Sequence, residues 1–416
     1  MYRIMTETTS PKKPGEREFI VMMAATMALN ALAIDSMLPA FPAIADRLNV
    51  VPFNNVQSII GIYLLGLGVG SLFYGPLSDR YGRKPVLLIA VLGYSIFSFG
   101  CSLASSFELL LTLRFFHGLA SAALGVLVIS IIRDLFSGDA MAKRMSTIFL
   151  IFMVVPVIAP TMGQAILLFA GWRTIFDVMA VMGLLMAFWL YRRLPETLHP
   201  DNVIPIEHRA IAATWRDVVF HRNAAGYMIG SAMVQGSLFG FLNSSQQIFD
   251  RVFDAKDFFP IGFAIVGAGL AISNFTNSRV VERFGARRVS HTALVVFILC
   301  GVAQLLAAIY APNSLPLFLA LLTVNMSMVG FIGSNFSSIA MTPFGDKAGA
   351  ASSFQMFART IIAALIGAGI GREFNGSVVP MAVGFLSCGL VALALILWCE
   401  KGKLFTRPKT TTCSPM

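Results

Sequence analysis

The sequence predicts an all-α integral membrane protein whose twelve transmembrane helices form two pseudo-symmetric six-helix bundles. Three observations predict this fold class. Of the 416 residues, 56% are hydrophobic and only 12% are charged, whereas a soluble domain carries about 25% charged residues. Apolar runs of about 20 residues, the length that a helix needs to cross a bilayer, recur along the chain. A charged turn in the first half recurs in the second half.

The apolar runs fall into two sets of six, because the longest polar gap lies between the sixth and the seventh. The runs cover residues 19–41, 55–76, 86–104, 107–132, 145–168, 174–192, 223–247, 258–278, 289–310, 315–340, 350–371 and 377–399. The predicted units are an N-terminal tail, a first bundle, a linker, a second bundle and a C-terminal tail, at residues 1–18, 19–192, 193–222, 223–399 and 400–416.

The distribution of basic residues predicts the orientation. With the N-terminus inside, the cytoplasmic segments hold 24 Lys and Arg residues and the outer segments hold 5. Because Lys and Arg collect on the cytoplasmic side, we expect both termini in the cytoplasm and the chain in the inner (plasma) membrane. The same bias accounts for the net charge of +10, so we expect the lipid bilayer and not nucleic acid as a partner.

The sequence lacks the residue patterns that several kinds of functional site require. The five cysteines form no CxxC pair and have no His at metal spacing, which argues against a disulfide framework or a metal site. No nucleophile pairs with a base, and no loop is suited to phosphate. The glycine triplets at 66–70 and 367–371 lie inside apolar runs and indicate packing faces. We therefore expect neither an enzyme nor a cofactor.

The charged turn at residues 75–85 joins the second and third spans. Its acid-Arg-aromatic-Gly-x-base pattern at 79–84 recurs at 282–287, which is 203 residues later and at the equivalent turn of the second half. Parallel halves of this kind are typical of transporters that hold a substrate between two rocking bundles. Positive-inside topology explains the basic residues of the turn but not its glycines and acid at this spacing.

The turn also carries a family resemblance. Gly75-x-x-x-Asp79-Arg80-x-Gly82-Arg83-Lys84 resembles the loop signature of the major facilitator superfamily. More narrowly, the chain resembles the Bcr/CflA branch of drug–proton antiporters, through the stretches at 34–42, 114–120, 133–134, 171–176 and 195–198. The resemblance covers all twelve spans and is weaker in the second half. It implies the major facilitator fold and a working monomer.

Asp35 lies in the outer part of the first span, where a carboxylate is costly and is expected to face the bundle interior. Burial disfavours the ionised form, so we expect Asp35 to exchange a proton and to attract cationic or polar compounds. The alternative is that Asp35 lies at the outer membrane interface, because Pro39 and Pro42 soon end the run.

Arg114 stays charged and therefore needs partners within the bundle. The resemblance places it in a fourth-span signature associated with proton transfer. The alternative is that Arg114 snorkels outward to pair with Glu108. The neighbouring His117 is interpreted as a packed histidine in preference to a second proton site.

The 75–85 turn is predicted to form a cytoplasmic gate. Gly75 and Gly82 allow close backbone approach and positive φ, and Pro76 is expected to limit the turn. By resemblance, Asp79 would contact the first turn of the eleventh span and Arg83 would reach Asp134. The complete gate motif comprises Gly75, Asp79, Arg80, Gly82, Arg83, Lys84 and Asp134.

The fifth span carries a predicted kink at Pro156, Pro160 and Gly163. Related antiporters have glycines where this chain has Ala159 and Gln164, which leaves open how closely the span packs on its neighbour. Candidates for the lining of a central cavity are Asn30, Gln235, Phe239, Asn243, Met326 and Arg359. Of these, Arg359 is interpreted as paired across helices in preference to binding substrate.

The sequence thus predicts a secondary transporter that exports small amphipathic drugs or toxic compounds in exchange for protons, by alternating access. Asp35 and Arg114 are expected to couple proton and substrate movement. One alternative is a proton-linked importer of a nutrient or metabolite on the same fold. Another, of a different class, is a membrane sensor that transports nothing.

Overall fold

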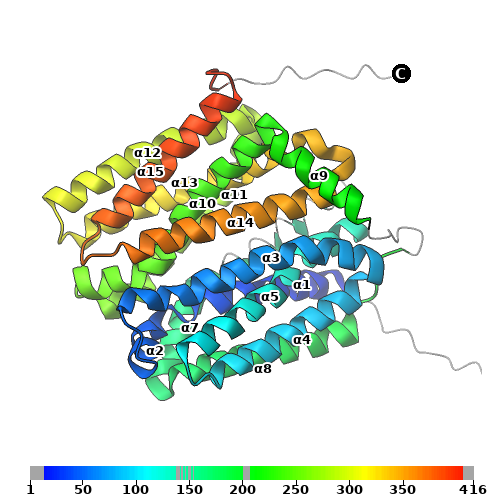
Figure 1. The fold of residues 1–416 in the computed structure, drawn as a ribbon, viewed down its shortest axis with the longest axis horizontal. Coiled ribbons are helices and arrows are strands. Elements are labelled where there is room, and N and C mark those ends of the chain that lie inside the picture. Colours follow the sequence, from blue (N-terminus) through cyan, green and yellow to red (C-terminus); the bar gives the residue numbers. More distant parts are fainter. Residues whose placement is uncertain are drawn as a thin grey trace, which may run out of the picture.

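The computed structural model describes residues 14–136, 154–199 and 207–405, together with 141, 144, 145, 147, 148, 151 and 152. Two groups of long helices lie side by side, and each group comes from one half of the chain (Figure 1). The long helices of the first group are α1 (Glu16–Asp35), α3 (Ser58–Tyr81), α4 (Arg83–Ser102), α5 (Phe107–Leu135), α7 (Val155–Phe169) and α8 (Trp172–Arg193). Those of the second are α10 (Arg222–Gln247), α11 (Phe259–Phe284), α12 (Ala286–Tyr310), α13 (Leu315–Met341), α14 (Ala348–Arg372) and α15 (Val379–Cys399).

These helices confirm the all-α fold class, and each predicted span corresponds to a helix in the predicted order. In the described part of the chain, ten helices are long and apolar enough to cross a membrane. The other two predicted spans are α10, which has 26 residues but many polar side chains, and the described part of the fifth span, α7, which has 15 residues. The protein is therefore a multi-pass membrane protein.

The first span ends earlier than predicted. Helix α1 stops at Asp35 instead of continuing to residue 41, and a short 3-10 turn (Leu38–Ala40) leads into helix α2 (Phe41–Arg47). Pro39 has no N–H to offer the carbonyl of residue 35, so the helical hydrogen-bond pattern breaks at this point. Asp35 consequently lies at a helix end, where the backbone turns.

The second span is longer than predicted, and the expected role of Pro76 is wrong. Helix α3 runs through Pro76 to Tyr81, and α4 begins at Arg83. Gly82 alone makes the turn, with φ 98° and ψ 151°. Gly285 makes the equivalent turn between α11 and α12 with φ 83° and ψ 148°, which gives the predicted sequence repeat the same backbone conformation in both halves.

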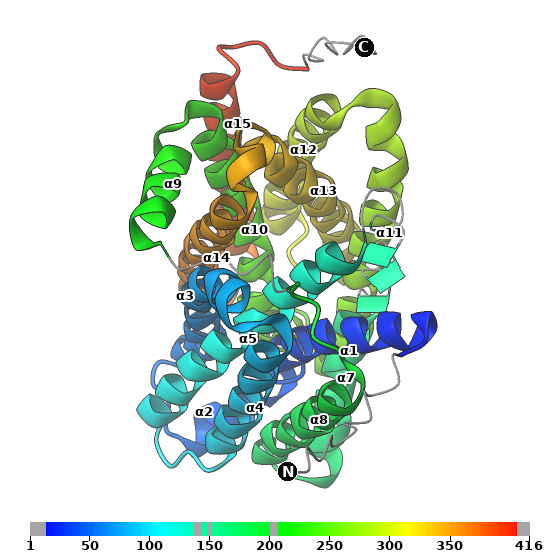
Figure 2. The same ribbon diagram turned by 90° about the vertical axis from the view of Figure 1, so that its right-hand side faces the viewer.

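Helices α3 and α14 join the two groups along their length (Figures 1 and 2). Gly68 faces Ile361, and a Cβ at Gly68 would lie 2.8 Å from Ile361 Cδ1. Near the end that holds the Gly82 turn, a Cβ at Gly75 would lie 3.0 Å from Ser353 Oγ. Gly75 therefore permits the close approach that the sequence predicts.

Contacts between the halves also form at the opposite end of the bundle. Asn54, in a short 3-10 helix before α3 (Phe53–Gln57), donates to the carbonyls of Arg372 and Phe374, each at 3.0 Å. Gln247 at the end of α10 donates to Asn54 Oδ1 at 3.2 Å. The two halves are thus bridged by hydrogen bonds at the predicted outer end.

The predicted linker contains a helix that the sequence analysis missed. Helix α9 (His208–Phe220) lies beside α14 (Figure 1). The rings of Trp215 and Phe354 stack with centroids 5.9 Å apart, and Val218 is buried in the apolar cluster against which Phe354 packs. The apolar face of α9 therefore packs against α14 and holds the linker on the second half of the protein.

Candidate functional site

Asp35 is buried at the end of α1, with only 5% of its surface exposed. In the described part of the chain, its carboxylate makes no hydrogen bond or ion pair. Asp35 therefore faces the protein interior and not lipid, as predicted, and it lies at the end of α1, close to the prolines on which the alternative rests. An acidic side chain that is buried without a partner is unusual, because the desolvation of a charge needs compensation.

Arg114 on α5 is completely buried. It donates from Nη2 to the carbonyl of Ala33 at 3.0 Å and from Nε to the carbonyl of Ile59 at 3.3 Å. It makes no ion pair with Glu108 or with any other acid in the described chain, so the snorkelling alternative is wrong. Arg114 instead binds the backbone two residues before Asp35, which places a fixed positive charge close to the end of α1.

Aromatic side chains complete the surroundings of Arg114. Its guanidinium carbon lies 4.2 Å from the ring centroid of Tyr63, a cation–π contact. Its Nη1 lies 3.1 Å from His117 Nδ1, and because Arg114 can only donate, His117 carries its proton on Nε2. The Tyr63 hydroxyl donates to Asn30 Oδ1 at 2.6 Å. Asn30, Tyr63, Arg114 and His117 thus form one polar cluster beside Asp35, in which all but the half-buried Asn30 are fully buried.

The predicted kink region brings α7 onto the same helix end. Pro156 lies in the first turn of α7 and Pro160 lies inside it. A Cβ at Gly163 would overlap the backbone carbonyl of Ser36, the residue after Asp35. The fifth span therefore packs directly on the first through Gly163, which answers the packing question that its departures from the related antiporters left open.

The second half contains a cavity with about 520 Å³ of empty space, part of it open to solvent. Two of the predicted lining residues, Gln235 and Arg359, line it. Helices α10, α11, α13 and α14 supply its walls, with Ser231, Val234, Gln235, Leu238, Leu270, Asn274, Val329, Gly330, Gly333, Ser334 and Arg359.

The other four predicted cavity residues lie elsewhere. Asn30 belongs to the buried cluster of the first half. Phe239 packs against Gly367 and Met326 is fully buried, so both fill space between helices. Asn243 is buried near Gly371. Helical periodicity turns only some of the polar side chains of α10 toward the cavity. The sequence pattern alone does not show which of them face it.

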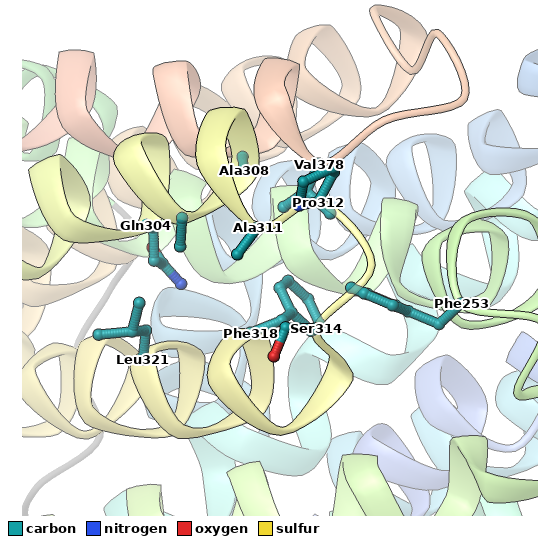
Figure 3. Close-up of a pocket in the computed structure, with 10 residues that line it drawn as sticks. Phe253, Gln304, Ala308, Ala311, Pro312, Ser314, Phe318, Leu321 and Val378 are labelled. Atoms are coloured by element: carbon teal, nitrogen blue, oxygen red, sulfur yellow. The ribbon is translucent and has the colours of Figure 1, made fainter.

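A second, shallower pocket lies where α12 and α13 meet the loop between them (Figure 3), and its 260 Å³ of empty space includes open solvent. Phe253, Phe318 and Val378 contribute to its largely apolar lining. Gln304 points into it, and its amide has no hydrogen-bond partner among the described residues. None of the predicted site residues lines this cavity.

The gate motif forms the predicted pair between Arg83 and Asp134. Arg83 donates from Nε to Asp134 Oδ2 at 2.7 Å, and its side chain is only 4% exposed. Its Nη1 contacts Asp79 Oδ1 at 2.5 Å and Ser78 Oγ at 2.6 Å. Asp79 is thus held by Arg83, and in the described residues it makes no hydrogen bond to the first turn of α14.

The remaining basic residues of the motif differ in their roles. Arg80 is exposed. Lys84 donates from Nζ to the carbonyl of Tyr191 at 2.9 Å. These two contribute positive charge at this end of the bundle, whereas Arg83 alone is buried in an ion-pair network.

Sequence reasoning missed Glu196, which completes this network. Its carboxylate accepts hydrogen bonds from the backbone N–H groups of Arg83 at 2.9 Å and Lys84 at 3.2 Å, at the start of α4. Glu196 thus places an anion at the N-terminus of α4, which differs from the predicted contact of Asp79 with the eleventh span. We call Asp79, Arg83, Asp134 and Glu196 the latch network.

The second half has a counterpart of Glu196. Glu400 follows α15 as Glu196 follows α8, and it forms an ion pair with Arg287 Nε at 2.9 Å near the start of α12. The Tyr227 hydroxyl also donates to Glu400 at 2.7 Å. The sequence repeat offered a signal for both acids, because each follows the last span of its half.

Comparison with known proteins settles the family. The family model of the Major Facilitator Superfamily matches residues 23–368. The chain belongs to this superfamily. A bicyclomycin resistance protein homolog from Haemophilus influenzae is 30% identical over 377 residues, covering 90% of this chain and 94% of that protein. The multidrug resistance protein MdtL of Escherichia fergusonii is 26% identical over 400 residues, covering 92% of this chain and 96% of that protein.

These relatives confirm the resemblance to the Bcr/CflA branch that the motifs predict. A solved structure of a D-xylose-proton symporter is similar with a TM-score of 0.69 at 16% identity, covering 93% of this chain and 99% of that one. At this identity the likeness shows the shared fold of this major facilitator superfamily member and nothing of its substrate.

Proposed function

We propose that this protein exports small amphipathic compounds in exchange for protons. Its relatives named for bicyclomycin and multidrug resistance support efflux. The observation that carries the proton coupling is the buried, unpartnered carboxyl of Asp35 beside the Arg114 cluster. A carboxyl with no fixed partner is able to take up a proton in one conformation and release it in the other, whereas a tight ion pair favours the ionised form of a carboxylate.

The same arrangement supports a mechanism of alternating access. Asp35 lies where α1 ends and α7 packs on Ser36, so relative motion of these helices changes the surroundings of the carboxyl. When the site opens outward, Asp35 takes up a proton and the substrate leaves. When it opens inward, the proton leaves and a new substrate binds. We place both termini in the cytoplasm of the inner membrane, as the basic residues predict.

The test is proton movement in energised inverted vesicles that contain the wild type or Asp35→Asn. We expect addition of an exported compound to release protons from the lumen with the wild type and not with Asp35→Asn. Asp46→Asn is a matched control, because Asp46 is exposed on the neighbouring helix α2. Equal proton release by wild type and Asp35→Asn would contradict the coupling role of Asp35.

Two other outcomes distinguish the alternative functions. A proton-linked importer would move protons and substrate in the same direction. A sensor would show no flux of either. In cells, the exporter is expected to raise resistance to the same compounds whose addition moves protons, and Asp35→Asn is expected to abolish that resistance without lowering the amount of protein in the membrane.

A further inference from the structure

Arg359 on α14 is the one charged side chain among the residues that line the 520 Å³ cavity. Its Nη1 donates to Ser337 Oγ at 3.0 Å. Its Nε is buried, and neither Nε nor Nη2 makes a hydrogen bond within the described part of the chain. Nε and Nη2 form the edge of a guanidinium that binds two oxygens at once. Within the described residues, the bidentate edge of Arg359 therefore has no protein partner.

Among the described residues that line the cavity, no acid neutralises Arg359. Helices α10, α13 and α14 contain no Asp or Glu, and α11 contains only Glu282, in its last turn three residues before Gly285. The other charged residues of these helices, Arg222, Arg279, Arg283 and Arg372, are basic and lie at or near the helix ends. A positive charge within a membrane-spanning bundle is costly unless an anion or polar groups compensate it.

The rest of the cavity is suited to an amphipathic molecule. The amides of Gln235 and Asn274 and the hydroxyls of Ser231 and Ser334 supply neutral hydrogen-bonding groups. Apolar wall residues are Val234, Leu238, Leu270 and Val329. A Cβ at Gly333 would meet no atom within 4 Å, so this glycine leaves room in the wall.

We propose that Arg359 binds the anionic group of an acidic amphipathic substrate, a carboxylate or an equally acidic group. Both oxygens of that group would accept from the Nε–Nη2 edge, and the apolar body would lie against the aliphatic wall. This inference rests on the proposed export function for its physiological meaning, because it names the class of compound that the cavity selects. The binding chemistry itself requires no proton gradient.

The experiment measures binding of matched probe pairs to the purified full chain in lipid nanodiscs by isothermal titration calorimetry. The probes are arylalkanoic acids and their primary amides, for example 1-naphthylacetate and 1-naphthylacetamide, at a pH where the acid is ionised. We expect the wild type to prefer the acid, and Arg359→Gln to lose about tenfold to hundredfold of its affinity for the acid. Its affinity for the amide is expected to change by less than about twofold.

Two further variants keep the test decisive. Arg279→Gln removes a charge of the same sign from an exposed position on α11 and is expected to leave the preference intact. Arg359→Lys keeps the charge but loses the bidentate edge, and is expected to retain a reduced preference for the acid. If Arg359→Gln does not fold, Arg359→Lys tests the proposal instead. A smaller preference for the acid over the amide than in the wild type supports the anion site, and an unchanged preference contradicts it. Equal binding of acid and amide by the wild type overturns the proposal, as does equal weakening of both by Arg359→Gln.

The same measurements separate this inference from the proposed export function. A preference for the acid that depends on Arg359, found in a protein that moves no protons in vesicles, would uphold the anion site and refute antiport. Proton-coupled export with no preference for acids over amides would uphold antiport and refute the anion site.

Discussion

Arg83→Gln tests whether the latch network stabilises the first half of the protein through one buried ion pair. The substitution removes the positive charge of Arg83. The carboxylates of Asp79 and Asp134, which both pair with Arg83, are then left without a partner of opposite charge at this site. Arg80→Gln is a matched control three residues away, because it removes the same charge from an exposed position of the same motif. Plain positive-inside topology predicts equal effects for the two variants.

The magnitude follows from burial. Breaking a fully buried ion pair costs about 3–5 kcal/mol, whereas an exposed pair contributes about 0–1 kcal/mol. The side chain of Arg83 is 4% exposed, that of Asp134 is 16% exposed and that of Asp79 is 28% exposed. Because water reaches the acids in part, we expect Arg83→Gln to lower the free energy of unfolding by about 2–3 kcal/mol. For Arg80→Gln we expect less than about 0.5 kcal/mol.

The assay is unfolding in mixed micelles, monitored by circular dichroism, within a double-mutant cycle. Arg83→Gln combined with Asp134→Asn is expected to show a coupling energy of about 1.5–3 kcal/mol, because each variant removes the same interaction. Arg80→Gln combined with Asp134→Asn is expected to be additive within about 0.5 kcal/mol. Equal destabilisation by Arg83→Gln and Arg80→Gln, or additivity in the first cycle, would refute the reasoning.

Three further predictions concern contacts at the other sites. Gly163→Val is expected to push α7 away from the backbone of Ser36 and to abolish substrate-dependent proton release in vesicles, whereas Gly171→Val, at a glycine with no neighbour within 4 Å of an added Cβ, is expected to leave it intact. Glu196→Gln is expected to lower the free energy of unfolding by about 0.5–1 kcal/mol, measured in mixed micelles, because α4 loses an anion at its N-terminus. Gly333→Leu is expected to fill part of the 520 Å³ cavity and to weaken binding of naphthyl probes in calorimetry without lowering the yield of folded protein.

The features predicted well from the sequence were those that depend on composition and on local backbone geometry. Hydropathy located the spans because a helix in lipid satisfies its own backbone groups and needs only length and apolar side chains. Gly82 was identified as a turn glycine because positive φ is easily reached only without a Cβ. The pairing of Arg83 with Asp134 came from the family resemblance, and its geometry agrees.

The features predicted poorly depend on how distant segments meet. Asp79 turned toward Arg83 and not toward α14, because the helix through residues 79–81 brings the two side chains together locally. Glu196 lies 113 residues after Arg83, and no periodic pattern reveals which helix N-terminus it reaches. Pro76 stayed inside α3, since a proline in a membrane helix interrupts one hydrogen bond without ending the helix when its neighbours hold it in place.

The buried charges are divided unequally between the halves, and this division makes a final prediction. The first half holds Asp35 and Arg114, and the cavity of the second half holds Arg359. If the proton binds Asp35 and an acidic substrate binds Arg359, one exchange cycle carries a negative charge out and a positive charge in. Each charge moved is worth about 2.3 kcal/mol per 100 mV of membrane potential.

Export of an acid moves two charges, whereas export of its neutral amide moves only the charge of the proton. Export of the acid is therefore expected to respond about twice as steeply to an imposed potassium diffusion potential, measured as steady-state accumulation in proteoliposomes at equal pH on both sides. Equal slopes for the two compounds would mean that the anion leaves with a compensating cation or that the acid crosses in its neutral form, and either result would contradict the separate roles assigned to Asp35 and Arg359.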